Sequence, residues 1–196
     1  MSVTTRAQFL RTAGSGGLAL IAGGSALGLA QGTALAAATS SGDVAIAKLA
    51  ATAELLAIDF YTRAIASKQL RGDELSYLAG ALGNEQAHYA ALKNVLGAAA
   101  PKGLTFRYPA GSFSSRKHIG ALGQALETAF VGAYMGAVSA LRSNDLKAVA
   151  AEIGACESRH LSVLTNIAAN MIVPAPNLPQ VLTAAEATKA VSSFIG

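Results

Sequence analysis

Four long segments of the chain repeat apolar residues with the spacing of an α-helix. They cover residues 43–67, 73–98, about 117–142 and about 145–171. Each segment is longer than the average helix of a globular protein, and such lengths are typical of helix bundles. Runs in which apolar and polar residues alternate, which would predict strands, are almost missing. The pattern therefore predicts an all-α protein built on four helices.

The connections between these segments indicate how the helices pair. About five residues join the first helix to the second, and the third to the fourth. Because so short a connection reverses the chain direction, each pair forms an antiparallel hairpin. Between the hairpins lies "AAPKGLTFRYPAGSFSSRK", which contains two prolines and suits one long crossover along the bundle. We expect Asp73 and Asn144 to cap the starts of the second and fourth helices.

Residues 1–36 differ in composition from the rest of the chain. Arg6 and Arg11 precede a Gly- and Ala-rich apolar run, which ends in a small-x-small pattern at 34–36 and holds no acidic residue. These features are typical of an export signal. The stretch "TTRAQFLRTAG" resembles a twin-arginine signal, with Ala7 in place of the second arginine. We therefore expect an exported protein, periplasmic or extracellular.

A retained membrane anchor is the alternative interpretation of this segment. The apolar run approaches the ~20 residues that a helix needs to span a bilayer. Its glycines and Gln31 argue against an anchor. We expect no stable membrane span after processing.

The other end of the chain, residues 172–196, begins irregularly. Thr183 and Glu186 then form a capping-box pattern, which predicts a short last helix. That helix docks either on the bundle or on a partner. The expected organisation is an export signal at 1–36, a bundle at 43–171 and this tail.

Composition and charge exclude some classes of function. The chain is 52% hydrophobic and has a formal net charge of +4. Because its basic residues are scattered, we expect no nucleic-acid partner. Cys156 is the single cysteine, so an internal disulfide is excluded, and we expect a small buried hydrophobe at this position.

Each of the four helices carries one glutamate on its apolar face. Two of these glutamates are followed three residues later by a histidine on the same face, because residues three apart are neighbours on a helix. The six residues are Glu54, Glu85, His88, Glu127, Glu157 and His160.

Four carboxylates in a core require compensation, since burying an isolated charge costs several kcal/mol. No Lys or Arg lies on the same faces near them. Two divalent ions would carry the matching positive charge, and carboxylate oxygens with imidazole nitrogens suit iron or manganese. A hydrogen-bonded Glu–His network without metal, with raised carboxylate pKa values, is the alternative.

The spacing of these residues favours the metal interpretation. Glu54 precedes Glu85 by 31 residues, and Glu127 precedes Glu157 by 30. The two halves therefore repeat one pattern, a glutamate on the first helix and Glu-x-x-His on the second. Chance predicts only about 0.1 Glu-x-x-His motif in a chain of this composition.

Four stretches carry a resemblance to a known family: "AELLAIDFY", "NEQAHYAAL", "LETAFVGAY" and "CESRHLSVL". Over residues 45–171 the chain resembles the ferritin-like di-iron carboxylate proteins, and among them the exported, desiccation-related ferritin-like group. The resemblance implies a ferritin-like four-helix bundle that binds two Fe or Mn ions. It implies bridging roles for Glu85 and Glu157, with the other four residues as terminal ligands. The acidic residue expected near Ala57 is missing here.

Two tyrosines repeat with the pattern, because Tyr61 and Tyr134 each follow a glutamate by seven residues. We expect packed rings with satisfied hydroxyls, which is the usual state of buried tyrosines. A role in electron relay or in a hydrogen bond to a ligand is the alternative. His118 stands at the start of a helix beside Arg116 and Lys117, where we expect a solvated side chain.

The leading functional hypothesis is a metal-dependent oxidoreductase or iron-handling protein that reacts with O₂ or peroxide. Its activity would be ferroxidase-, peroxidase- or catalase-like, with no catalytic residue beyond the metal site. The alternative is a structural, stress-protective bundle, since fold alone does not determine function. A third hypothesis is a bundle that binds a lipid or small apolar ligand. A homo-oligomer is among the arrangements left open.

Overall fold

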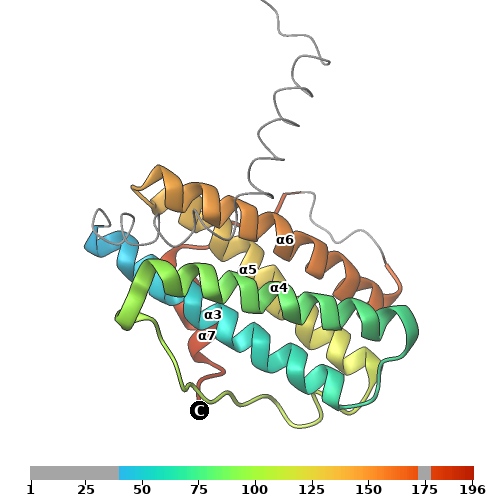
Figure 1. The fold of residues 1–196 in the computed structure, drawn as a ribbon. Coiled ribbons are helices and arrows are strands. Elements are labelled where there is room, and N and C mark those ends of the chain that lie inside the picture. Colours follow the sequence, from blue (N-terminus) through green and yellow to red (C-terminus); the bar gives the residue numbers. More distant parts are fainter. Residues whose placement is uncertain (1–39, 172–177) are drawn as a thin grey trace, which may run out of the picture. The chain divides into compact units, whose positions relative to one another are not determined.

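The computed structural model describes residues 40–171 and 178–196 (Figure 1). Within these ranges all the elements are helical, as the sequence predicts. Four helices are long and one is short: α3 (Ser41–Ala66), α4 (Gly72–Leu96), α5 (Arg116–Ala140), α6 (Asn144–Ala169) and α7 (Ala184–Ser192). A 3₁₀ turn, η1 (Gly97–Ala99), follows α4. The expected export signal at 1–36 lies outside the described residues.

The long helices pack in pairs, α3 with α4 and α5 with α6. Residues 67–71 join the first pair and residues 141–143 the second, whereas residues 97–115 run between the pairs. In Figure 1 this connection passes along the bundle from the end of α4 to the start of α5. The predicted fold of two antiparallel hairpins and a long crossover is confirmed. Among the described residues, no helix is both long enough and apolar enough to cross a membrane.

Serines cap the starts of α3, α5 and α6, whereas no side chain caps the start of α4. The Ser143 side chain accepts from the backbone N–H of Leu146 (3.4 Å), so the prediction of Asn144 as N-cap is wrong by one residue. The prediction for Asp73 is also wrong. The chain enters α4 at Gly72, whose φ is 56°, and Asp73 already lies in the first turn. Its carboxylate is favourable there because the helix dipole is positive at that end.

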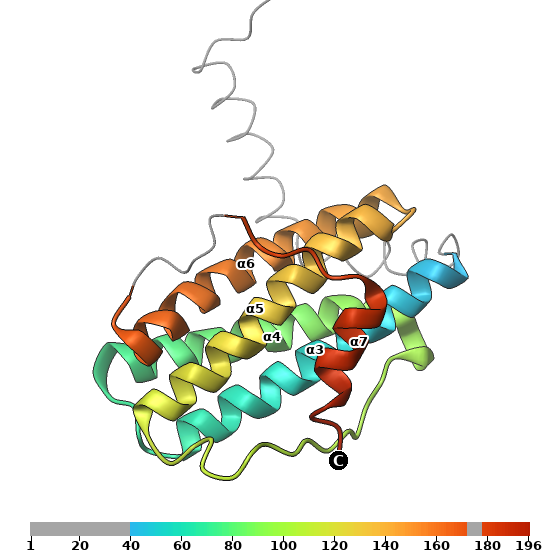
Figure 2. The ribbon, with the colours of Figure 1, turned by 180° about the vertical axis from the view of Figure 1, so that it is seen from behind.

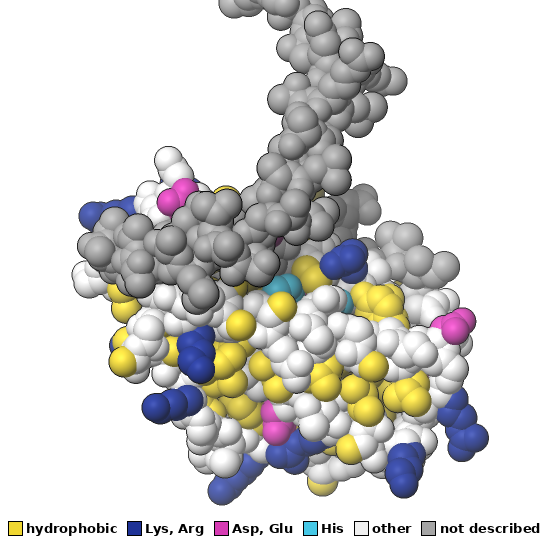
Figure 3. All heavy atoms as spheres, in the orientation of Figure 1, with side chains coloured by type: hydrophobic (Ala, Val, Ile, Leu, Met, Phe, Trp, Pro, Cys, Tyr) yellow, Lys and Arg dark blue, Asp and Glu magenta, His cyan; other side chains and the backbone are white. Residues whose placement is uncertain are grey.

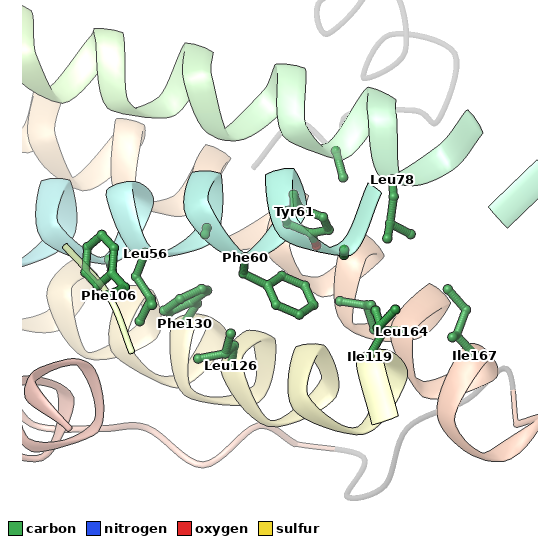
Figure 4. Packing of buried hydrophobic residues seen from close by; sticks show 14 of the residues in the cluster. Leu56, Phe60, Tyr61, Leu78, Phe106, Ile119, Leu126, Phe130, Leu164 and Ile167 are labelled. Carbon is green, nitrogen blue, oxygen red and sulfur yellow. The ribbon is translucent and has the colours of Figure 1, made fainter. Parts of the chain in front are cut away.

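The core lies between the two hairpins and is built from leucine, isoleucine and phenylalanine. Figure 4 shows side chains of α3 and α5 facing each other, with side chains of α4 and α6 beside them. All of the following are at most 5% exposed: Leu56, Phe60, Leu78, Ile119, Leu126, Phe130, Leu164 and Ile167. This packing holds the four inward faces at a fixed separation.

The tail docks on the bundle, which answers the question that the sequence leaves open. Helix α7 packs against α3 and α5, as Figure 2 shows from behind. The predicted capping box is confirmed, because Thr183 and Glu186 bond each other's backbone N–H groups. After α7 the chain pairs with the crossover, where Arg107 N–H donates to the Phe194 carbonyl (2.7 Å).

Candidate metal centre

The four long helices bring all six predicted residues into one cluster. Glu54 comes from α3, Glu127 from α5, and the two Glu-x-x-His pairs from α4 and α6. The four glutamates are at most 2% exposed and His160 is fully buried, whereas the His88 side chain is 14% exposed. In Figure 3 histidine atoms reach the surface on the face where α4 and α6 lie in Figure 1. The cluster is therefore closed to solvent except beside His88.

The cluster consists of two overlapping sets of four residues. One set contains Glu54 and His88, the other contains Glu127 and His160, and both contain Glu85 and Glu157. Within each set the candidate ligand atoms all lie within 4.8 Å of one another. Each set is therefore compact enough to hold a metal ion.

Glu85 and Glu157 each direct one oxygen toward each histidine. Glu85 Oε2 lies 3.3 Å from His88 Nδ1, and Glu85 Oε1 lies 2.8 Å from His160 Nδ1. Glu157 repeats this arrangement with distances of 3.2 Å to His88 Nδ1 and 2.9 Å to His160 Nδ1. By contrast, Glu54 lies near His88 alone (3.3 Å) and Glu127 near His160 alone (3.8 Å). Two carboxylates thus stand between the histidines, and two stand at the ends.

The two tyrosines hold these end carboxylates from opposite hairpins. Tyr61 of α3 donates its hydroxyl to Glu127 Oε1 on α5 (2.5 Å). Tyr134 of α5 donates in return to Glu54 Oε1 on α3. Both rings are buried, so the prediction of packed rings with satisfied hydroxyls is confirmed. Each hydroxyl contacts Oε1, and the other carboxylate oxygen, Oε2, makes no hydrogen bond.

Burial and neighbouring charges shift the pKa values of the cluster glutamates. Burial, together with the nearby Glu157 and Glu85 carboxylates, raises the pKa values of Glu54 and Glu127 well above their ordinary range. Burial acts in the same direction on Glu85, but its contacts with the two histidines lower its pKa to about 2.

The pKa values of the two histidines also shift. Burial alone would lower the pKa values of His88 and His160, but their contacts with Cys156 and the surrounding carboxylates raise both. These pKa shifts favour the protonated forms of both histidines and of Glu54 and Glu127. A bound metal must displace such protons, because it binds the deprotonated forms of its ligands.

Four buried oxygens test whether the cluster fits a metal. Glu54 Oε2, Glu85 Oε1, Glu127 Oε2 and Glu157 Oε1 make no hydrogen bond, although a histidine nitrogen lies 2.8–3.3 Å from each of these oxygens except that of Glu127. Buried polar atoms without a partner are rare and require an explanation, such as an ion. One such oxygen comes from each long helix. Together with two imidazoles they form an oxygen-rich donor set that suits iron or manganese.

Comparison with known families agrees with this geometry. A family model described as a ferritin-like domain matches residues 42–170, which is well over half of the chain. The chain belongs to the ferritin-like domain family. The match runs from the start of α3 to the end of α6, so this ferritin-like region contains all six cluster residues. A search of curated proteins found no significant match.

Two residues beside the ferritin-like cluster were not predicted to lie near it. The Asn84 amide lies 3.1 Å from His160 Nε2, and Cys156 Sγ lies 3.7 Å from the same nitrogen. Cys156 is buried, as expected, but it also contacts a histidine and accepts from Arg159 (3.0 Å). The i,i+4 spacing from Cys156 to His160 is the signal that reveals this contact. Asn84 lies on the opposite hairpin, so no spacing in the sequence predicts its contact.

His118 lies outside the cluster, as predicted. Its side chain is exposed at the start of α5, where Nδ1 lies 2.9 Å from the Ser114 hydroxyl.

Proposed function

We propose that this ferritin-like protein binds two iron or manganese ions and uses them to react with O₂ or peroxide. The observation that carries the proposal is the pair of overlapping ligand sets that share Glu85 and Glu157. A glutamate from each of two helices and Glu-x-x-His from each of the other two is the donor arrangement of di-iron and di-manganese carboxylate bundles.

The geometry supports a separate role for each residue. Glu85 and Glu157 would bridge the two ions, because each directs an oxygen toward both histidines. His88 and Glu54 would complete one site, and His160 and Glu127 the other. When bound, such a metal pair supplies electron transfer to or from oxygen species. Tyr61 and Tyr134 hold the end carboxylates in place, and the surrounding core excludes water.

We also propose that the protein acts after export. The support is the composition of residues 1–36, in which two arginines precede an apolar run that ends in a small-x-small cleavage pattern. N-terminal sequencing of the protein from the supernatant or periplasm of an expressing cell tests this. A new N-terminus close to residue 37 is expected, and an intact Met1 in the cytoplasmic fraction contradicts it.

A structural, stress-protective role is the second candidate. One observation favours it: the six residues come from all four long helices, so bound metal would cross-link both hairpins. The two candidates differ in turnover. An oxidoreductase consumes O₂ or peroxide repeatedly, whereas a structural site binds metal without consuming either.

Metal content tests the proposed function directly. The full-length protein is purified without chelator, loaded anaerobically with Fe(II) or Mn(II), and measured by elemental analysis beside Glu85→Gln/Glu157→Gln. About two ions per chain are expected for the wild type, and a large loss for the double variant. Glu152→Gln, an exposed change on α6, is the matched control and retains the metal. A wild-type protein without stoichiometric metal contradicts the proposal.

Two assays on the loaded protein then separate the activities. Oxidation of Fe(II) with consumption of O₂ indicates a ferroxidase-like reaction. Evolution of O₂ from peroxide by the manganese form indicates a catalase-like reaction. Metal binding without either activity supports the structural candidate.

A further inference from the structure

An apolar pocket lies between α3, α5 and the tail segment that carries α7. Figure 2 shows α7 and the chain before it lying over these two helices. The pocket has a volume of ≈ 40 Å³. Alanines from all three elements line much of it, namely Ala50 and Ala53 of α3, Ala133 and Ala137 of α5, and Ala184 and Ala187 of α7. The space remains because small side chains meet there, where larger ones would fill it.

The lining determines which molecules the pocket can hold. Every side chain in it is apolar except that of Tyr134, whose hydroxyl already donates to Glu54. A water molecule inside needs two to four polar partners, and this pocket offers almost none. Apolar sites that offer water so few partners take up small apolar molecules. An engineered cavity that binds benzene has a volume of ~150 Å³, so this pocket suits molecules of a few atoms only.

The pocket is one side chain away from the candidate metal centre. The Tyr134 ring forms part of its wall, and the Tyr134 hydroxyl contacts Glu54 on the far side. Ala53, another wall residue, directly precedes Glu54 in α3. A molecule held here is therefore next to the set that contains Glu54 and His88.

We propose that this pocket is a binding site for dioxygen on its way to the metal centre. Dioxygen is small, uncharged and apolar, as the lining requires. Peroxide is disfavoured because its hydroxyl groups would lose their hydrogen bonds with water and find no replacement. The inference rests on the proposed function and refines it, since it names dioxygen as the molecule that this pocket would take.

Xenon is the probe, because it is apolar, small and detectable without any metal. Crystals of the metal-free protein under xenon pressure, or ¹²⁹Xe NMR in solution, report binding directly. Ala133→Val and Ala50→Val fill the pocket from opposite walls, and Ala121→Val changes an exposed alanine of the same helix α5. Circular dichroism confirms that each variant keeps its helices. Xenon is expected to occupy the pocket in the wild type and in Ala121→Val, and to be lost in both filled variants.

Kinetics of the metal-loaded protein test delivery to the centre. The KM for O₂ is expected to rise several-fold in Ala133→Val and Ala50→Val, with kcat at saturating O₂ unchanged. Ala121→Val keeps the wild-type KM. A wild-type pocket without xenon overturns the proposal, and so does an unchanged KM in variants that no longer bind xenon. Xenon binding needs no metal. A failure of metal loading therefore contradicts the proposed function, but it does not affect the xenon test of the pocket.

Discussion

At the scale of single residues, the two tyrosine hydroxyls set the orientation of the end carboxylates. We predict that Tyr61→Phe and Tyr134→Phe each lower the free energy of unfolding by about 1–3 kcal/mol, because each leaves a buried oxygen of Glu127 or Glu54 without a partner. Each is also expected to weaken metal binding at its own end of the cluster. Urea titration with and without metal measures both effects.

Tyr89→Phe is the control for this pair. Its hydroxyl donates to the Pro101 carbonyl (2.7 Å), outside the cluster, so its loss should cost stability without changing metal affinity. Equal metal affinity in Tyr61→Phe, Tyr134→Phe and Tyr89→Phe would show that the cluster does not depend on these hydroxyls.

Asp43 shows how one residue makes stability depend on pH. Its carboxylate accepts from the backbone N–H groups of Arg142 (2.9 Å) and Ser143 (3.0 Å), and these bonds hold its pKa below the ordinary value, against the effect of burial. A lowered folded-state pKa stabilises the protein above the unfolded-state pKa of about 3.9, and this gain is lost as pH falls through the folded value.

Asp43→Asn is therefore expected to cost roughly 1–2 kcal/mol near pH 7, where the wild-type carboxylate is charged. The difference from the wild type should shrink below about pH 4, as the native carboxyl becomes protonated. Urea unfolding of both proteins between pH 7 and pH 3 provides the measurement. A difference that stays constant over this range would assign the cost to packing instead of charge.

At the scale of elements, the tail docks through two glycines of α5. A side chain at Gly132 or Gly136 would collide with the backbone oxygen of Gln180 or Leu182. The Leu182 N–H also donates to the Gly132 carbonyl (3.0 Å). The close approach of two backbones thus fixes the segment that forms the outer wall of the apolar pocket.

We predict that Gly136→Ala displaces this segment and destabilises the fold, because the added methyl group meets backbone that is held by α7. Hydrogen exchange should show faster exchange in residues 178–196 than in α3 to α6. The matched control is Gly80→Ala on α4, where an added Cβ meets nothing within 4 Å. It is expected to stabilise the protein by ~0.5–1 kcal/mol, as alanine does in an exposed helix. If the amides of residues 178–196 exchange as slowly in Gly136→Ala as in the wild type, the docking of the tail does not depend on this glycine.

The same elements show how far the sequence alone predicts this molecule. Helix periodicity and loop length predict the hairpins, and helical spacing on the apolar faces predicts the six cluster residues, because both signals are local. The contacts of Asn84 with His160, and of Asp43 with the 141–143 turn, join residues far apart in the chain. Such contacts depend on how whole helices pack, which no local pattern encodes. The docking of the tail on Gly132 and Gly136 is also a contact between distant parts of the chain, so the sequence pattern does not predict it.

At the scale of the whole molecule, metal binding and folding should be coupled. Four helices converge on one cluster in which burial raises the pKa values of two glutamates. A ligand that binds only the folded state stabilises it by ~2.7 kcal/mol at a concentration of 100 Kd. For a chain of this size, that free energy corresponds to a rise in Tm of roughly 5–10 °C.

We therefore expect anaerobic Fe(II) or Mn(II) to raise the Tm by at least this amount, and removal of the metal with a chelator to reverse the rise. Differential scanning calorimetry measures the shift, and Glu85→Gln/Glu157→Gln should show none because both sets lose their shared carboxylates. An equal shift in the double variant would place the binding outside the cluster. A large rise in Tm without turnover of O₂ or peroxide would show that the metal only cross-links the two hairpins. Turnover together with the same rise in Tm would show that one cluster both stabilises the bundle and catalyses its reaction.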